Sequence, residues 1–250
     1  MFEVIQNFEK EIINLYKSED LVALQDNDYK YNGINVLEVS GIPSKSIRKN
    51  KNFKPVENSW DIINCNSDLR YFTALLYLYR PYINNPYFEN IKHDGRIIYT
   101  YFQSLEDHRY SQFASICFEK LYNFCDRIGD LMAFHHYDKF STRENIYFSN
   151  VVDKLKKDPN IESNKFFKEI LRYQETTFTE FNSERRDIVH NKQFETKYRF
   201  NFTIHCTVED EIRKLWVIKS SLPEFFKRNL TLANDLFYNT FMYLRNGHLP

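Results

Sequence analysis

The sequence predicts an all-α protein, an antiparallel helical bundle with minor β elements. Three observations predict it. Several long segments carry apolar residues at spacings of three and four, the pattern of helices with one buried face. Motifs in which serine or threonine precedes an acidic residue by three positions stand before three of these segments and are typical helix starts. Apolar residues make up 42% of the 250 residues and aromatic residues 17%, enough for a core rich in packed rings.

The first part of the chain, residues 1–66, is predicted to be a helix followed by a looser loop and hairpin region. Phe2 to Lys17 has apolar residues at helical spacing. Asn32-Gly33 lies between short apolar runs and indicates a hairpin turn. A basic loop from Lys45 to Lys54 follows, with Phe53 and Trp60 nearby. Such a loop can hold single-stranded RNA by charge and stacking, although a plain surface loop is the commoner case.

Residues 67–250 are predicted to form one helical domain. In order, its predicted elements are a helix from about Ser67 to Tyr79, a strand at 96–103, a long helix opened by Ser104–Asp107 and ending near Phe134, a shorter helix opened by Ser141–Glu144, a turn at Asp158–Asn160, and a helix from about Asn164 to Val189.

The last part of this domain is predicted to contain a strand and two helices. Aromatic and apolar residues alternate with polar ones from Tyr198 to Cys206, which favours a strand. Thr207–Asp210 would cap the next helix, Pro223 would interrupt it, and a final helix would continue to about Leu244.

Composition excludes several classes of protein. The five glycines lie far apart, so a Walker loop, a dinucleotide-binding loop and a nucleophile elbow are excluded in their standard forms. Histidine and cysteine spacings fit no standard zinc motif, so no metal or other cofactor is predicted. Asp126 with Asp130 is interpreted as a solvated or salt-bridged face, and His135-His136 with Asp138 as a loop at a helix end.

Charge and apolar runs bear on location and partners. Basic and acidic residues number 34 each, so nucleic acid could be contacted only through a local basic patch. No apolar run reaches the length of a membrane span, and acidic residues within 1–17 are unlike a secretory signal. With four cysteines interpreted as free thiols, a cytoplasmic location without membrane contact is predicted.

One candidate for chemistry stands out, the segment from Glu184 to Asn191. Arg185 occupies a position on the otherwise apolar face of the predicted 164–189 helix, and arginine is rarely buried without a partner. His190 follows where the helical pattern ends. Arg185 therefore points into a salt bridge, a polar cleft or an interface.

An arginine, four residues and a histidine at the end of a long bundle helix resemble the R-x4-6-H motif of the HEPN superfamily. Residues 118–131 resemble an earlier long helix of bacterial HEPN proteins, and 142–157 resemble their third helix. The resemblance covers about 104–195. Arg186 stands where the family usually has a small polar residue, and Lys192 stands where some HEPN toxins have a modified tyrosine.

The resemblance implies a metal-independent endoribonuclease, in a toxin or antiviral role, with RNA as substrate and a homodimer as the assembly. Arg185 would bind the scissile phosphate and His190 would act as general acid or base. Arg186, Asn191 and Lys192 would assist in binding RNA phosphates. An antitoxin or regulatory protein would be a further partner. Three alternatives stay open: a structural Arg–His pair capping a helix, a non-catalytic HEPN module that binds RNA or protein, and a purely structural dimer.

Overall fold

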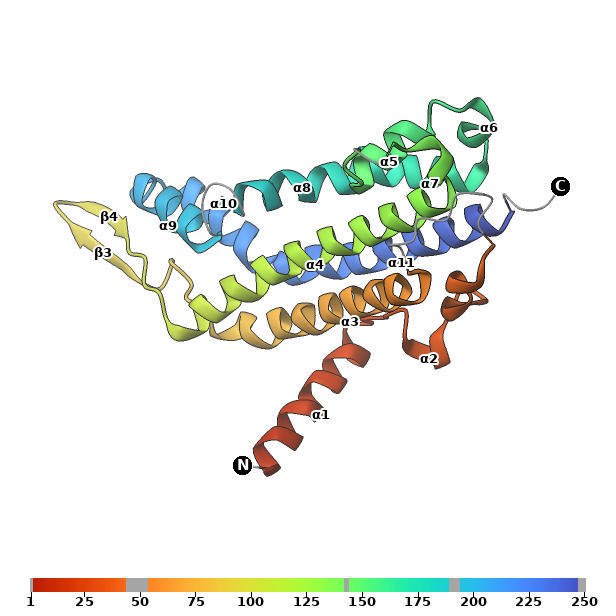
Figure 1. Ribbon diagram of the computed structural model, residues 1–250. Coiled ribbons are helices and arrows are strands. Elements are labelled where there is room, and N and C mark those ends of the chain that lie inside the picture. Colours follow the sequence, from red (N-terminus) through yellow and green to blue (C-terminus); the bar gives the residue numbers. More distant parts are fainter. Residues whose placement is uncertain (1, 44–53, 142–143, 189–193, 247–250) are drawn as a thin grey trace. The chain divides into compact units, whose positions relative to one another are not determined.

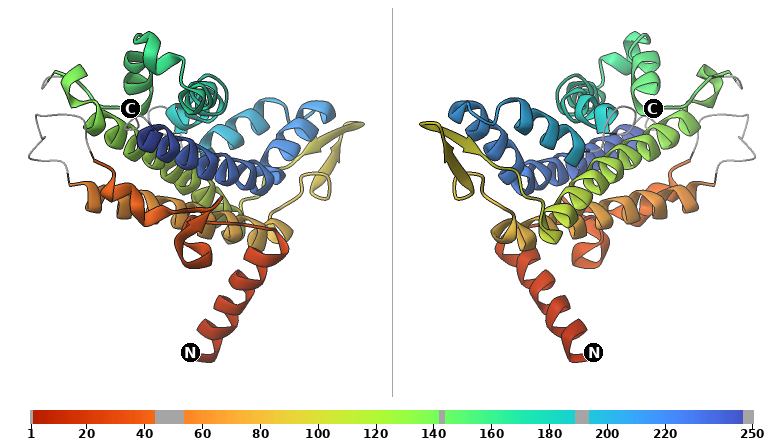
Figure 2. Two further views of the ribbon diagram at one scale, coloured as in Figure 1. Left: turned by 90° about the vertical axis from the view of Figure 1, so that its right-hand side faces the viewer. Right: turned by 90° about the vertical axis from the view of Figure 1, so that its left-hand side faces the viewer.

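The computed structural model describes residues 2–43, 54–141, 144–188 and 194–246, and it is mostly helical (Figures 1 and 2). Its elements are α1 (Phe2–Ser18), α2 (Asp26–Tyr29), β1 (Lys30–Tyr31), β2 (Ile34–Asn35), the 3-10 helix η1 (Val36–Gly41), α3 (Pro55–Tyr79), η2 (Arg80–Tyr82), β3 (Asn90–His93), β4 (Arg96–Tyr99), α4 (Leu105–His135), η3 (Tyr137–Lys139), α5 (Phe148–Leu155), α6 (Pro159–Glu162), α7 (Lys165–Tyr173), the π-helical turn η4 (Gln174–Phe178), α8 (Thr179–Arg186), α9 (Phe194–Ile204), α10 (Glu209–Ser220) and α11 (Leu222–Asn246). Among these residues, no helix has the length and apolar character that a membrane crossing requires.

The chain divides into two compact units, each built from three separate segments. The first unit comprises residues 1–21, 70–119 and 183–228, and the second comprises 22–69, 120–182 and 229–250. Helices α3, α4, α8 and α11 each contribute residues to both units. The sequence boundary predicted at residue 66 divides the chain differently and stays a prediction.

The second unit has an apolar core in which close helix contact depends on a glycine. The buried residues of this core include Phe124 and Ile128 of α4, Phe148 and Val151 of α5, Phe167 of α7, and Phe237 of α11. A Cβ atom on Gly129 would lie 2.9 Å from the Cα of Phe148, so glycine lets the start of α5 lie directly against α4. The side chain of Asp126 accepts a hydrogen bond from the Phe148 backbone nitrogen at 3.2 Å, which satisfies a free donor at that helix start.

The first unit combines an apolar cluster with a buried ion pair. Tyr99, Tyr198, Phe202 and Ile212 form the cluster. Beside it, the Lys219 ammonium lies 2.7 Å from the Asp107 carboxylate, and both side chains are only 1% exposed. Asp107 also receives hydrogen bonds from the backbone nitrogen and hydroxyl of Ser104, at 3.2 and 2.9 Å. The predicted capping box at Ser104–Asp107 is therefore confirmed, and it is joined to a buried lysine.

Several predicted elements are confirmed by the structure. These are the first helix, the turn at Asn32-Gly33 between β1 and β2, the long helix α4, and the break before Pro223. Three boundaries differ. Helix α3 begins at Pro55, well before Ser67. Glu144 forms a turn with Ser141, but α5 begins only at Phe148. The N-cap residue of α10 is Val208, which makes no side-chain cap, so the helix does not begin with the predicted cap at Thr207–Asp210.

The predicted C-terminal strand at 198–206 is wrong, because Phe194–Ile204 is the helix α9. The buried residues Phe194, Tyr198 and Phe202 recur every four positions, whereas Phe200 and Ile204 are exposed. Burial at every fourth residue is the pattern of a helix packed on one face. The sequence alternates like a strand because the exposed Phe200 lies midway between the buried Tyr198 and Phe202, which adds an aromatic residue at a spacing of two.

Candidate functional site

The candidate site begins at the C-terminal end of α8, where two adjacent arginines have different surroundings. Arg185 lies four positions after the fully buried Phe181 and is half-buried, whereas Arg186 is exposed. Successive residues of an α-helix point about 100° apart, which explains the difference. Asp187 and Ile188 continue as a π-helical turn. This order of exposure is the one expected if Arg185 continues the inner face of the helix.

The other residues predicted for the site come soon after α8 in the sequence. His190, Asn191 and Lys192 lie outside the residues that the structure describes. The chain is described up to Ile188 and again from Phe194. The geometry of the site is therefore defined by the ends of α8 and α9, which flank the segment that carries His190.

Lys197 of α9 joins these two helices. Its ammonium lies 2.9 Å from the Glu184 carboxylate and 3.0 Å from the Asp187 carboxylate of the chain at the end of α8. Burial lowers the pKa of Lys197, but the hydrogen bonds and charges of Glu184 and Asp187 outweigh it and raise that pKa. Lys197 thus stays charged at neutral pH and holds the start of α9 near Arg185 and Arg186.

The inner face of α9 fixes the same helix from the other side. The hydroxyl of Ser111 donates a hydrogen bond to the Glu195 carboxylate, and burial raises the pKa of Glu195. The Lys219 ammonium lies 4.7 Å from the centre of the Tyr198 ring, a cation–π contact. The first turns of α9 are consequently held by polar as well as aromatic contacts.

Lys197 was missed by the sequence analysis, and the reason is the wrong strand. A strand would turn alternate residues from Tyr198 onward to one side and would give Lys197 no particular partner. A helix starting near Phe194 places Lys197 one turn into α9, within reach of acidic residues at the end of α8. The acidic Glu184 and Asp187 were visible signals, but only after α9 is recognised as a helix.

The aspartates and histidines that the sequence analysis did not interpret as metal ligands have structural partners. Asp126 caps α5, and Asp130 forms an ion pair with Arg127 at 2.7 Å. The Nε2 atom of His136 lies 2.7 Å from the Tyr243 hydroxyl. Across the described ranges, no three His, Cys, Asp or Glu side chains are grouped as a metal site would require.

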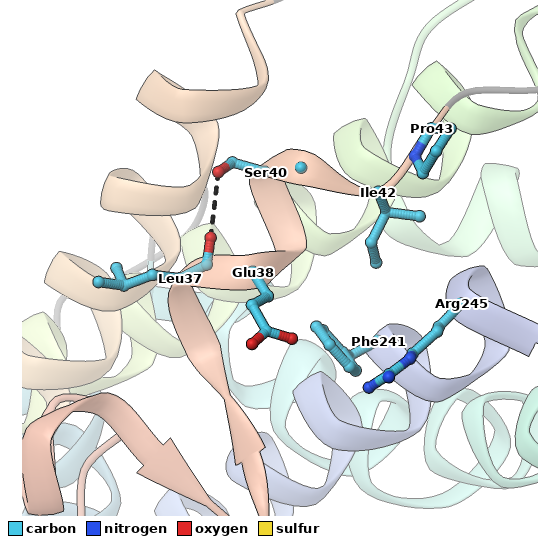
Figure 3. Close-up of a pocket in the computed structure, with 8 residues that line it drawn as sticks. Leu37, Glu38, Ser40, Ile42, Pro43, Phe241 and Arg245 are labelled. Carbon is cyan, nitrogen blue, oxygen red and sulfur yellow. Dashed lines mark hydrogen bonds between the residues drawn. The ribbon is translucent and has the colours of Figure 1, made fainter.

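A separate hollow of about 420 Å³ lies in the second unit between η1 and the end of α11. Figure 3 shows Glu38 and Arg245 at this hollow with Phe241 beside them, and Ile42 pointing into it. The Arg245 guanidinium lies 6.0 Å from the centre of the Phe241 ring. This hollow was not predicted from the sequence, because its two sides come from residues far apart in the chain, 37–43 and 241–245.

The family model HEPN_Cthe2314-like HEPN matches residues 62–245. The chain belongs to this HEPN family. The match begins inside α3, ends in the last turn of α11 and includes the whole 185–192 segment of the HEPN domain. Neither a curated protein nor a solved structure matches this HEPN protein. The all-α fold and the HEPN membership predicted from Arg185, His190 and the preceding helices are both confirmed.

Proposed function

We propose that this HEPN protein is a metal-independent endoribonuclease and that Arg185 and His190 are its catalytic pair. The observation that carries the proposal is the HEPN family match together with a half-buried arginine at the end of α8, immediately before the segment that contains the histidine. HEPN domains also serve as binding modules, so the chemistry needs its own test.

The residues are suited to RNA cleavage by transesterification. A base removes the proton of the ribose 2′-hydroxyl, whose oxygen attacks the adjacent phosphorus. The bond to the 5′-oxygen breaks, and an acid protonates that oxygen. The products are a 2′,3′-cyclic phosphate and a 5′-hydroxyl end. Because the reaction needs a 2′-hydroxyl, it would be selective for RNA over DNA.

Arg185 and His190 would divide this work. The guanidinium of Arg185 is always charged and presents fixed donors to the phosphate, where negative charge increases in the transition state. His190 would transfer a proton, because an imidazole with an ordinary pKa near about 6.5 can act as acid or base at neutral pH. In the proposed homodimer, a second copy of the histidine would supply the other proton transfer. Arg186, Asn191 and Lys192 would contact neighbouring phosphates.

The proposal is tested by incubating purified protein with mixed RNA in excess EDTA. We expect cleavage to continue, to leave cyclic phosphate ends, and to disappear in the His190→Ala variant. Activity that is lost in EDTA and restored by a divalent ion would contradict the mechanism. RNA binding without cleavage would instead favour a non-catalytic HEPN module. A toxin or antiviral role, with an antitoxin or regulatory protein as partner, would follow only from cleavage.

A further inference from the structure

In the part of the chain that the structure describes, neither face of a two-stranded hairpin in the first unit is covered. Strands β3 and β4 pair antiparallel from Asn90 with Tyr99 to His93 with Arg96. Asp94 and Gly95 form the turn, and both have positive φ angles, 49° and 74°. Every residue from Asn90 to Ile97 is exposed. Figure 1 shows the hairpin extending beyond α9. Isolated hairpins are only marginally stable in water, so contacts at the end of this hairpin opposite its turn must stabilise it.

The base of the hairpin is fixed to α9 and the residues after it. The backbone nitrogen of Tyr99 donates to the carbonyl of Cys206 at 2.8 Å. The Tyr99 ring packs in the cluster that contains Tyr198 and Phe202 of α9. The hairpin is therefore attached to α9, the helix whose Lys197 forms ion pairs with Glu184 and Asp187 at the end of α8.

The hairpin carries two exposed basic side chains, Lys92 and Arg96, with the acidic Asp94 at the turn between them. Lys92 and Arg96 form no ion pair among the described residues, and His93 meets only the exposed Asp94, at 3.5 Å. Five other basic side chains of this unit do form ion pairs with carboxylates, in the pairs Arg80–Glu224, Lys197–Glu184, Arg213–Glu209, Lys214–Glu211 and Lys219–Asp107. Paired residues of a hairpin share a face, so His93 and Arg96 lie on one face and Lys92 on the other.

Apolar side chains accompany this charge. The ring of Phe88, just before β3, is 86% exposed, and Ile91 and Ile97 are 52% and 41% exposed. Exposed aromatic rings and basic side chains along one element are the combination that binds single-stranded nucleic acid, with bases stacking on rings and phosphates contacting cations. The chain has no net charge, so a nucleic-acid ligand requires such a local patch.

We propose that the β3–β4 hairpin is an arm that binds single-stranded substrate RNA, with Lys92 and Arg96 on phosphates and Phe88 under a base. The proposal deepens the proposed ribonuclease function and rests on it for the identity of the substrate. Single-stranded rather than duplex RNA is the ligand, because only unpaired bases can stack on a protruding ring.

The test measures RNA binding directly, in full-length protein carrying His190→Ala so that the probe stays intact. The probe is a fluorescent single-stranded RNA of mixed sequence without stable hairpins, and a duplex of the same sequence is compared. Lys92→Gln/Arg96→Gln should weaken binding at low salt on the order of tenfold and reduce the slope of log affinity against log salt by about 1.4. Phe88→Ala should weaken binding about 5-fold to 140-fold.

The matched control is Lys10→Gln/Lys17→Gln, which removes two positive charges from exposed positions on α1 in the same unit. Binding of the control should stay near that of the parent. Equal losses in both double variants, equal binding of duplex RNA, or no RNA binding by the parent would overturn the arm. A hairpin variant that changes the oligomer mass but not RNA binding would identify a protein interface and also overturn it. Cleavage by the wild-type chain is measured separately, so the proposed RNA binding by the hairpin can be disproved without disproving the proposed ribonuclease activity.

Discussion

At the scale of single residues, the two neighbouring carboxylates on α4 have different environments. Asp126 accepts a hydrogen bond from the start of α5, whereas Asp130 is partly buried beside Arg127. Burial raises the pKa of Asp130 from 3.8 to about 6, against the lowering effect of Arg127, and the charge of Asp126 raises it further. The folded protein therefore favours the protonated form of Asp130 more than the unfolded chain does.

We predict that Asp130 makes stability depend on pH. Because its folded pKa lies above its unfolded value, its contribution is present at low pH and is lost as pH rises through about 6. Relative to Asp130→Asn, the wild-type unfolding free energy should increase by at most about 1 kcal/mol between pH 7 and pH 5, after allowance for solvent screening. Urea unfolding of both proteins at the two pH values measures this. A wild-type unfolding free energy that, relative to Asp130→Asn, is the same or lower at pH 5 than at pH 7 would contradict the prediction.

At the scale of elements, α9 shows why the sequence could be read in two ways. Aromatic residues at 194, 198, 200 and 202 satisfy both a period of two and a period near four. β-propensity depends on packing context and cannot decide between the two periods. Helices α1 and α4 carry long patterns with one helical period, so their existence was predictable. The short helices α2 and α6 were not predicted as helices, and α5 begins later than its predicted start at Ser141–Glu144.

Two phenylalanines of α9 distinguish the helix from a strand. We predict that Phe202→Ala costs roughly 3–5 kcal/mol of stability, because its ring is fully buried, whereas Phe200→Ala costs within about 0.5 kcal/mol. A strand would place both rings on one face and make both substitutions costly. Chemical denaturation of the two variants measures the difference, and similar costs would contradict the helix.

The buried ion pair between α4 and α10 makes a second prediction at this scale. Lys219→Met should cost roughly 3–5 kcal/mol, because it leaves the buried Asp107 carboxylate without its cation. Lys219→Met/Asp107→Asn should be more stable than the single variant, since asparagine keeps an oxygen for the Ser104 cap without the charge. Urea unfolding compares them. A double variant less stable than Lys219→Met would show that the charge itself is not the cause.

The candidate site was predictable from the sequence only in part. Arg185 and His190 were found because a polar residue interrupted an apolar helical face and matched a family spacing. Lys197 and the hairpin residues Lys92 and Arg96 were not singled out. Their roles depend on which helix they join or where a hairpin projects, and these are tertiary facts that local periodicity does not contain.

At the scale of the whole molecule, the two interleaved units mean that long helices, rather than a linker, connect them. A single Arg–His pair is a small catalytic constellation, and a two-fold assembly would bring two copies together. We predict a homodimer with the 185–190 segments close to each other. Light scattering at micromolar concentration should give twice the chain mass of 30.4 kDa. An Arg186→Cys variant should crosslink between chains more than the wild type does, and a monomer would contradict the assembly.

The central claim, RNA cleavage at Arg185 and His190, is tested most directly by comparing the adjacent arginines in excess EDTA. Half-buried Arg185 should contact the scissile phosphate, so Arg185→Ala should lower the cleavage rate about 10²–10³-fold while the protein stays folded. Exposed Arg186 should aid binding alone, so the defect of Arg186→Ala should shrink as salt rises. Single-turnover cleavage rates and melting temperatures are measured for both. An inactive Arg186→Ala beside an Arg185→Ala that merely unfolds would make Arg185 structural and contradict the account.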